Sequence, residues 1–280
     1  MAIFDGKRLR GIVGNIVFKD GKDKKNTIVQ QAPAVVRQSE KTKVASKVFG
    51  QGSVLAGVIR RAMEIITREC YDSGMCNRFN KPVRDILNKC FDKETETYNF
   101  QEDSFESLIG FEFNLQSLVS NSLYVKPVVS VNDSQLQVSL PEIQVKQQLK
   151  FPVGANLCEI GVVVCFVALE QGVKQDELFQ SIEIGSDATV LPAHDFTFEV
   201  PEGCLCVVGF GLNYFHKQND IKNVKTHKTF NPANICGAII TEGVLIDPGL
   251  VKIGNTCKPS PWSKIMKMNL GGTSEAQETG

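Results

Sequence analysis

Hydrophobic and polar positions follow two different spacings in this chain, and the change falls near residue 111. Residues 39–70 carry apolar side chains at spacings of three, four and seven, with Lys and Arg between them, which predicts an amphipathic helix. Three glycines weaken the middle of this segment, so it predicts either two helices or one kinked helix. A second helix is predicted over residues 82–91, with Asn80 as its N-cap and Pro82 in its first turn.

After residue 111 the apolar residues either alternate with polar ones or form short continuous runs, and both patterns are typical of strands. Turn signals rich in Gly, Pro, Asn and Asp separate these segments. Residues 157–169 are nearly all apolar, which predicts a central strand that is buried on both faces. The predicted strands cover residues 111–115, 136–140, 143–145, 157–169, 179–184, 196–200, 204–215 and 235–241.

The first forty residues contain two short apolar segments with a basic turn between them. Residues 11–18 form the first predicted strand, residues 20–26 the turn, and residues 27–31 the second strand, before Pro33 ends the pattern. Asp-Gly between β-branched segments is a hairpin signal. A hairpin this short is not stable alone. We therefore expect it to lie on another surface, either of its own chain or of a neighbour.

These patterns together predict an α+β fold, in which an N-terminal β-hairpin and helices precede an antiparallel β-sandwich of immunoglobulin-like (Ig-like) type. Four regions are expected. They are an N-terminal hairpin arm at 1–37, a helical region at 38–110, the β-sandwich at 111–250 and an extended C-terminal tail at 251–280.

The N-terminal motif reads Gly11-x-x-Gly14-Asn15-x-Val17-Phe18, followed by the basic turn and the Ala32-Pro33 stop. It resembles the opening of an uncharacterised family of Bacteroidota proteins. The similarity is specific over about residues 6–37, and it extends only in general layout to about residue 240. The resemblance implies a strand, a basic turn, a helix and a β-rich C-terminal half, in a protein of bacterial or bacteriophage origin. It implies no agreed activity, although some bacteriophage structural proteins of this group have a similar build.

Charge is balanced over the whole chain but is unevenly distributed. The 280 residues have a net charge of zero, so composition gives no electrostatic reason to expect nucleic acid as a partner. Residues 1–70 nevertheless hold 14 Lys and Arg against 6 Asp and Glu. Two interpretations stay open: a solvated helix face with a basic turn, or a basic arm that meets an acidic neighbour, such as another copy of this chain.

Charged residues and the length of the apolar segments also indicate where the protein is located. Charged residues interrupt the first twenty positions, so no signal peptide is predicted. The longest apolar segment, residues 160–169, is too short to span a bilayer, so no membrane span is predicted either. We therefore expect cytoplasmic synthesis without a signal peptide, after which the protein stays in the cytoplasm or leaves it inside a virion or another particle, or by lysis. Most of the nine cysteines lie in apolar segments, which predicts reduced, buried thiols.

The sequence contains no pattern that predicts catalysis. The histidines are scattered, the cysteine spacings do not match zinc sites, and the glycines at 50–57 lack the Lys-Ser/Thr pair of a phosphate loop. Carboxylates gather at 92–106 in a polar connector, without the spacing of a calcium loop. No enzyme activity, metal or cofactor is predicted.

We expect a non-enzymatic structural subunit of a virion or filament, which self-associates through its N-terminal arm. Its partners are expected to be other copies of itself or neighbouring structural proteins. The short, β-branched and open-edged strand at 11–18 suits addition to another sheet, and the basic turn is expected to meet acidic groups such as Glu94, Glu96 or Glu102. The predicted interface residues are Gly11, Gly14, Asn15, Val17, Phe18, Lys22, Lys24, Lys25 and Trp262.

Several alternatives stay open. A carbohydrate-binding or carbohydrate-processing β-sandwich needs a groove with paired carboxylates or with exposed Trp or Tyr. A nucleic-acid-binding accessory protein needs residues 19–25 to act with Arg60 and Arg61, although no aromatic residues alternate with these cations. Trp262 is either an anchor on a neighbour or packed onto its own sandwich, which is the favoured reading. An arm that folds onto its own chain leaves a monomeric domain without an assigned role.

Overall fold

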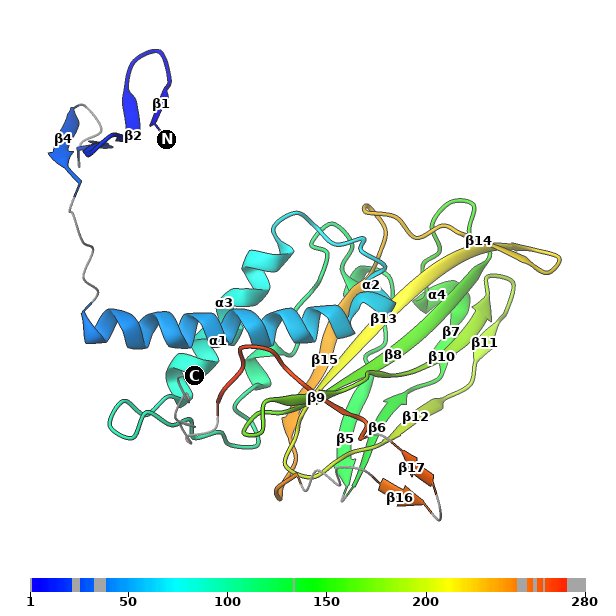
Figure 1. Cartoon of the computed structure of the whole chain (residues 1–280). Helices are drawn as coiled ribbons and strands as arrows, with labels where there is room; N and C mark the ends of the chain where they lie inside the picture. The colour runs from blue at the N-terminus through cyan, green and yellow to red at the C-terminus, as the bar shows by residue number, and fades with distance from the viewer. Residues whose placement is uncertain are drawn as a thin grey trace. The chain divides into compact units, whose positions relative to one another are not determined.

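The computed structural model describes residues 2–21, 26–32, 39–132, 134–245, 251–253, 256–258 and 260–270 (Figure 1). It divides the chain into two compact units, Met1–Ser46 and Lys47–Gly280. The boundary falls inside helix α1, Glu40–Ala62.

The N-terminal unit contains a four-stranded antiparallel sheet where a single hairpin was expected. Its strands, in spatial order, are β1 Ala2–Phe4, β2 Leu9–Val13, β3 Ile16–Asp20 and β4 Thr27–Gln31. The prediction of one strand over 11–18 is wrong, because a two-residue turn at Gly14 and Asn15 separates β2 from β3. Gly14 has φ +57°, which suits a glycine at the first central position of a hairpin turn.

The second predicted hairpin strand is confirmed as β4, which pairs with β3 from Ile16–Gln31 to Asp20–Thr27. The Gly21 N–H donates to the Asn26 carbonyl at 2.8 Å across the connecting turn. The three turn lysines of the predicted interface, Lys22, Lys24 and Lys25, lie outside the described residues.

The helical prediction for residues 39–70 is confirmed as two helices, α1 and α2, Glu64–Thr67. The break falls at Met63 and not at a glycine. Gly52 is buried where α1 meets α3, Met75–Cys90, and a Cβ at this position would lie 3.2 Å from the Arg84 Cα. Glycine therefore allows the two helix backbones to approach closely.

Helix α3 begins seven residues before the predicted first turn. Pro82 lies inside the helix, so the assignment of Asn80 as N-cap is wrong. The first turns form because Met75 and Phe79 are buried on the same stripe as Val83, at helical spacing. The polar residues between these positions conceal that stripe in the sequence.

The main sheet is built on two long antiparallel strands, β8 Leu157–Ala168 and β13 Leu205–Gln218. Its order is β14-β13-β8-β9-β18, with β10 also paired to β8 and β15 also paired to β13. The prediction of a central strand buried on both faces is confirmed in β8, where only Glu159 is partly exposed. The remaining strands are β9 Val173–Gln175, β10 Leu178–Gly185, β14 Ile221–Val224, β15 Ala233–Ile240 and β18 Trp262–Lys264.

Shorter elements complete the second unit. A three-stranded antiparallel sheet has the order β12-β6-β5, and two further pairs join β11 to β7 and β16 to β17. The strands are β5 Val128–Asn132, β6 Gln135–Leu140, β7 Ile143–Gln144, β11 Val190–Leu191, β12 His194–Glu199, β16 Val251–Ile253 and β17 Thr256–Lys258. The short helices are η1 Glu106–Leu108, η2 Val119–Asn121 and α4 Val145–Gln148.

The second unit is arranged in layers around β8 and β13. Odd-numbered residues of β8, such as Val163 and Cys165, belong to a core shared with the helices. Even-numbered residues, such as Val162 and Val164, belong to a core shared with β12, β6 and β5. Helices thus cover one face of the main sheet and the three-stranded sheet covers the other (Figure 1). The α+β class is confirmed, while the Ig-like arrangement stays a prediction.

Three local predictions need correction. Residues 111–115 form no named strand, because only Glu112 makes a bridge, to Asn234, while three backbone hydrogen bonds tie residues 110–113 to β15. Val145 starts α4 instead of extending a strand. The strand predicted at 204–215 extends further, because β13 includes His216 and runs into a hairpin with β14.

The described part of the predicted tail contains three strands and packs on the second unit. Strand β18 pairs with β9, and Ile265, Met268 and Leu270 are buried in the helical core. In the described ranges, no helix is both long enough and apolar enough to cross a membrane.

Candidate interaction surface and binding cavities

The N-terminal sheet has no core of its own, since none of the described residues from 2 to 46 is buried. Its large apolar side chains are exposed instead: Ile3 by 71%, Phe4 by 66%, Val29 by 58%, Val13 by 52% and Ile12 by 50%. A small sheet normally buries at least one face to be stable in water. This sheet is therefore our candidate interaction surface.

Apolar residues occur on both faces of the sheet. The register places Val13 opposite Ile16 and Phe18 opposite Val29, and directly opposed residues share a face. Ile12, which is opposite Val17, lies on the other face because side chains alternate along a strand. Neither face is the polar, solvated side of an ordinary two-layer sheet.

The predicted interface residues separate into three groups. Gly11 and Val17 lie in β2 and β3, beside Phe18, while Gly14 and Asn15 form the turn between these strands. The turn lysines are outside the described residues. Trp262 belongs to the second unit: it lies in β18, pairs with Gln175 and packs, partly buried, against the core of the three-stranded sheet. Trp262 thus packs on its own chain, while its role as an interface residue stays a prediction.

The two units carry opposite charges. Residues 1–46 contain ten Lys and Arg against four Asp and Glu, whereas residues 47–280 contain 21 against 27. Within the sheet, Asp20 pairs with Arg10 at 2.9 Å, and Asp5 accepts the backbone N–H of Arg8 and of Lys7. These hydrogen bonds lower the pKa of Asp5. The acidic side chains of the sheet are thus engaged locally, which leaves a net positive surface.

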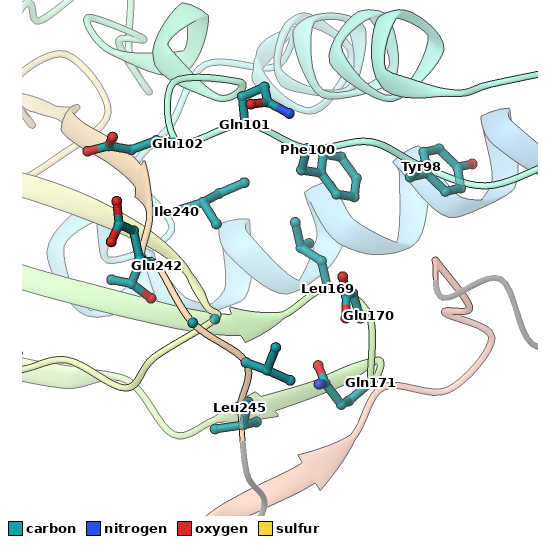
Figure 2. Close-up of a pocket in the computed structure, with 14 residues that line it drawn as sticks. Tyr98, Phe100, Gln101, Glu102, Leu169, Glu170, Gln171, Ile240, Glu242 and Leu245 are labelled. Atoms are coloured by element: carbon teal, nitrogen blue, oxygen red, sulfur yellow. The ribbon is translucent and has the colours of Figure 1, made fainter.

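An acidic groove, defined by Glu102, Glu170, Glu202 and Glu242, lies in the second unit. It consists of two adjoining hollows of about 400 and 510 Å³, which share Glu102 and Glu242. Figure 2 shows these two carboxylates at one end of the first hollow and Tyr98 at the other. No Lys or Arg is among the described residues that line the groove. Of the three acidic residues expected to meet a basic arm, only Glu102 lines it.

A different cavity, the Glu112 cavity, lies beside β15. Its volume is about 460 Å³, and its walls come from residues 109–112 around the end of η1, residues 119–127 and residues 234–236 of β15. Apolar side chains dominate the lining. They are Ile109, Val119, Leu123, Val125 and Pro127.

The Glu112 carboxylate is held in place by hydrogen bonds. The Val119 N–H donates to both of its oxygens, at 3.2 and 3.3 Å, and the Asn234 Nδ2 lies 3.5 Å from Oε1. Burial raises the pKa of Glu112 to about 7, against the lowering effects of these bonds and of Arg78. A carboxyl group that titrates near neutral pH inside an apolar cavity is a typical mark of a binding or catalytic site.

Little in the sequence points to this cavity. Glu112 stands between two phenylalanines, a pattern that predicts a half-buried strand with the Glu facing solvent. The chain instead folds residues 119–127 around the Glu112 side chain, which no local pattern indicates. The only trace of the cavity in the sequence is a single carboxylate between two phenylalanines, and this trace does not distinguish a buried Glu from an exposed one.

Metal ligands and cysteine thiols are the other groups that could carry chemistry. No group of three or more His, Cys, Asp or Glu that could hold a metal ion occurs in the described part of the chain. Burial raises the pKa of Cys204 and of Cys236 to about 12, so both thiols stay protonated and are poor nucleophiles at neutral pH.

Comparison of the chain with protein-family models, with curated proteins and with solved structures gives no match.

Proposed function

We propose that this protein is a non-enzymatic structural subunit of a larger assembly, such as a virion or filament. The N-terminal unit of one copy packs on a neighbouring copy. The observation that carries the proposal is the exposed N-terminal sheet, whose apolar side chains occupy both faces and which contains no buried residue among those described. Covering such a sheet on a neighbour removes this apolar surface from water.

Charge supports a second copy of this chain as the partner. The excess of Lys and Arg in residues 1–46 is matched by the excess of Asp and Glu in residues 47–280. Complementary charge on two units of one chain favours head-to-tail contacts, which form rings or filaments according to the rotation between copies. The acidic groove gathers four carboxylates of the second unit on one surface.

The proposal includes an Ig-like sandwich as the scaffold of the subunit. It is supported by the shared core between the main sheet and the strands β12, β6 and β5, all antiparallel. A sandwich that carries a separate N-terminal sheet suits a subunit that repeats in an assembly.

Light scattering after size-exclusion chromatography tests the proposal on the full chain. Val29→Lys places a charge on the exposed apolar face, so we expect it to shift an oligomer toward monomer. Thr27→Lys is the matched control, because Thr27 is exposed, polar and on the same face of the same strand. A wild-type chain that stays monomeric at high concentration, or a Val29→Lys variant that assembles like Thr27→Lys, contradicts the proposal.

A second candidate is a carbohydrate-binding role for the acidic groove. It is favoured by the two carboxylates, Glu102 and Glu242, and the two aromatic residues, Tyr98 and Phe100, that line one hollow (Figure 2). Binding on a glycan array that is lost in Glu242→Gln supports this role, and an array without bound glycans rejects it.

A further inference from the structure

The Glu112 cavity combines one carboxylate with apolar walls. Its volume of about 460 Å³ falls in the range of small-molecule sites, which bury an apolar ligand body and fix it by a few polar groups. Tyr124, which is 60% exposed, stands at the opening with Lys126. Glu112 is the only carboxylate among the described residues that line the cavity.

Hydrogen bonds orient the Glu112 carboxylate, but no Lys, Arg or His in the described part of the chain forms an ion pair with it. The Arg78 Nη1 donates to the main-chain carbonyl of Glu112 at 3.1 Å, while Nη2 of the same side chain pairs with Asp72. The Arg78 guanidinium therefore pairs with the carboxylate of Asp72 and not with that of Glu112.

We propose that this cavity binds a small organic cation, namely an amine carried on an apolar body of about the size of a phenylalkyl group. The ammonium donates to the Glu112 carboxylate and supplies the missing positive charge. The apolar body lies against Val119, Leu123 and Val125. The Tyr124 ring at the opening adds a face that attracts cations.

The charged and titratable groups around Glu112 define a pH dependence. Arg78 from α3 is paired with Asp72, and Lys126 is exposed at the rim of the cavity. The pKa of the Cys236 thiol from β15 is raised to about 12, so this thiol stays neutral. Because the pKa of Glu112 is about 7, the carboxyl is mostly protonated at pH 6 and mostly ionised at pH 8. A cation binds the ionised form, so the affinity rises about tenfold between these two pH values.

The test is an NMR or calorimetric titration of the full chain with phenethylamine, which stays protonated over this range, and with 2-phenylethanol as its neutral isostere. We expect the amine to bind more tightly than the alcohol and about tenfold more tightly at pH 8 than at pH 6. The alcohol should show no such change. Glu112→Gln should bind the amine no better than the alcohol, whereas Glu106→Gln, at an exposed position outside the cavity, should bind like wild type.

Ser120→Trp is a second variant, which fills the opening from an exposed position and keeps the carboxylate. It should abolish binding without a change in melting temperature, so a folding defect of Glu112→Gln does not decide the outcome. The proposal is overturned by equal affinity for amine and alcohol, by undiminished amine binding to Glu112→Gln or Ser120→Trp, or by no amine binding at about 10 mM. It does not depend on the self-association proposed above.

Discussion

Glu112 and Asn234 lie opposite each other in an isolated antiparallel bridge, and the Asn234 Nδ2 lies 3.5 Å from the Glu112 Oε1. The bridge connects the loop after η1 to β15. It thereby holds a carboxylate at the wall of an apolar cavity. Burial raises the pKa of this carboxyl group more than the hydrogen bonds lower it, so the protonated form is favoured.

The raised pKa of Glu112 predicts a pH-dependent loss of stability. The unfolded chain releases this proton near the ordinary carboxyl pKa of 4.5, and the folded chain releases it at a pKa of about 7. Stability is therefore greatest below the unfolded pKa and falls as the pH rises through the folded one. Allowing for solvent screening of a partly exposed group, the free energy of unfolding of wild type relative to Glu112→Gln should fall by about 1–2 kcal/mol from pH 5 to pH 8. Urea titrations at both pH values measure this difference, and a constant difference contradicts the pKa.

A pair of glycine substitutions should have opposite effects. A Cβ at Gly209 would lie 2.3 Å from the Met63 Sδ and 2.8 Å from the Ile66 Cδ1, so Gly209→Ala should destabilise the chain by about 1–3 kcal/mol. Gly50 lies in α1 with open space around it, so Gly50→Ala should stabilise it by about 0.5–1 kcal/mol. Thermal unfolding of both variants checks the packing of α2 on β13. Equal melting temperatures would show that this contact is absent.

Asn114 is a buried polar connector in the second unit. Its Nδ2 donates to the carbonyls of Cys70 at 3.0 Å and Lys228 at 2.7 Å, and the side chain is 1% exposed. Asn114→Ala leaves two carbonyls without this donor, which should cost about 2–3 kcal/mol in denaturant unfolding. Asn99→Ala, at an exposed position, should cost less than about 0.5 kcal/mol. A similar small cost for both variants would argue against the network.

Trp262→Ala separates packing within the chain from anchoring on a neighbour. Because Trp262 packs on the core of the three-stranded sheet, we expect a loss of about 1–3 kcal/mol in stability and unchanged self-association. Calorimetry and light scattering measure the two effects. Loss of assembly at unchanged stability would instead assign this residue to an interface.

The central strands could be predicted because nearly all of their residues are apolar, as burial on both faces requires. Strand β8 is buried on both faces, so its sequence is a continuous apolar segment. The turn at Gly14 and Asn15 also has a local signal, since Gly-Asn between β-branched residues is typical of a hairpin. The apolar residues on both sides of it favoured one long strand instead, because a sheet with two apolar faces lacks the usual alternation.

The start of α3 and the Glu112 cavity could not be predicted in the same way. The stripe that contains Met75 and Phe79 is interrupted by polar residues, and its burial depends on contacts with Phe111 and Phe113. The burial of Glu112 depends on residues 119–127 and on β15, more than 100 positions away in the latter case. Such burial is set by tertiary packing, which local spacing does not encode.

Isotope-resolved cross-linking tests self-association most directly. A photo-reactive residue at position 29 of the unlabelled full chain is mixed with ¹⁵N-labelled full chain, and cross-linked peptides are identified by mass spectrometry. We predict mixed-isotope pairs that join residues 1–46 of one copy to residues 47–280 of another, with fewer pairs at high salt because the two units carry opposite charges. Pairs confined to single-isotope peptides, together with a monomeric mass at every concentration, would contradict assembly through the N-terminal unit.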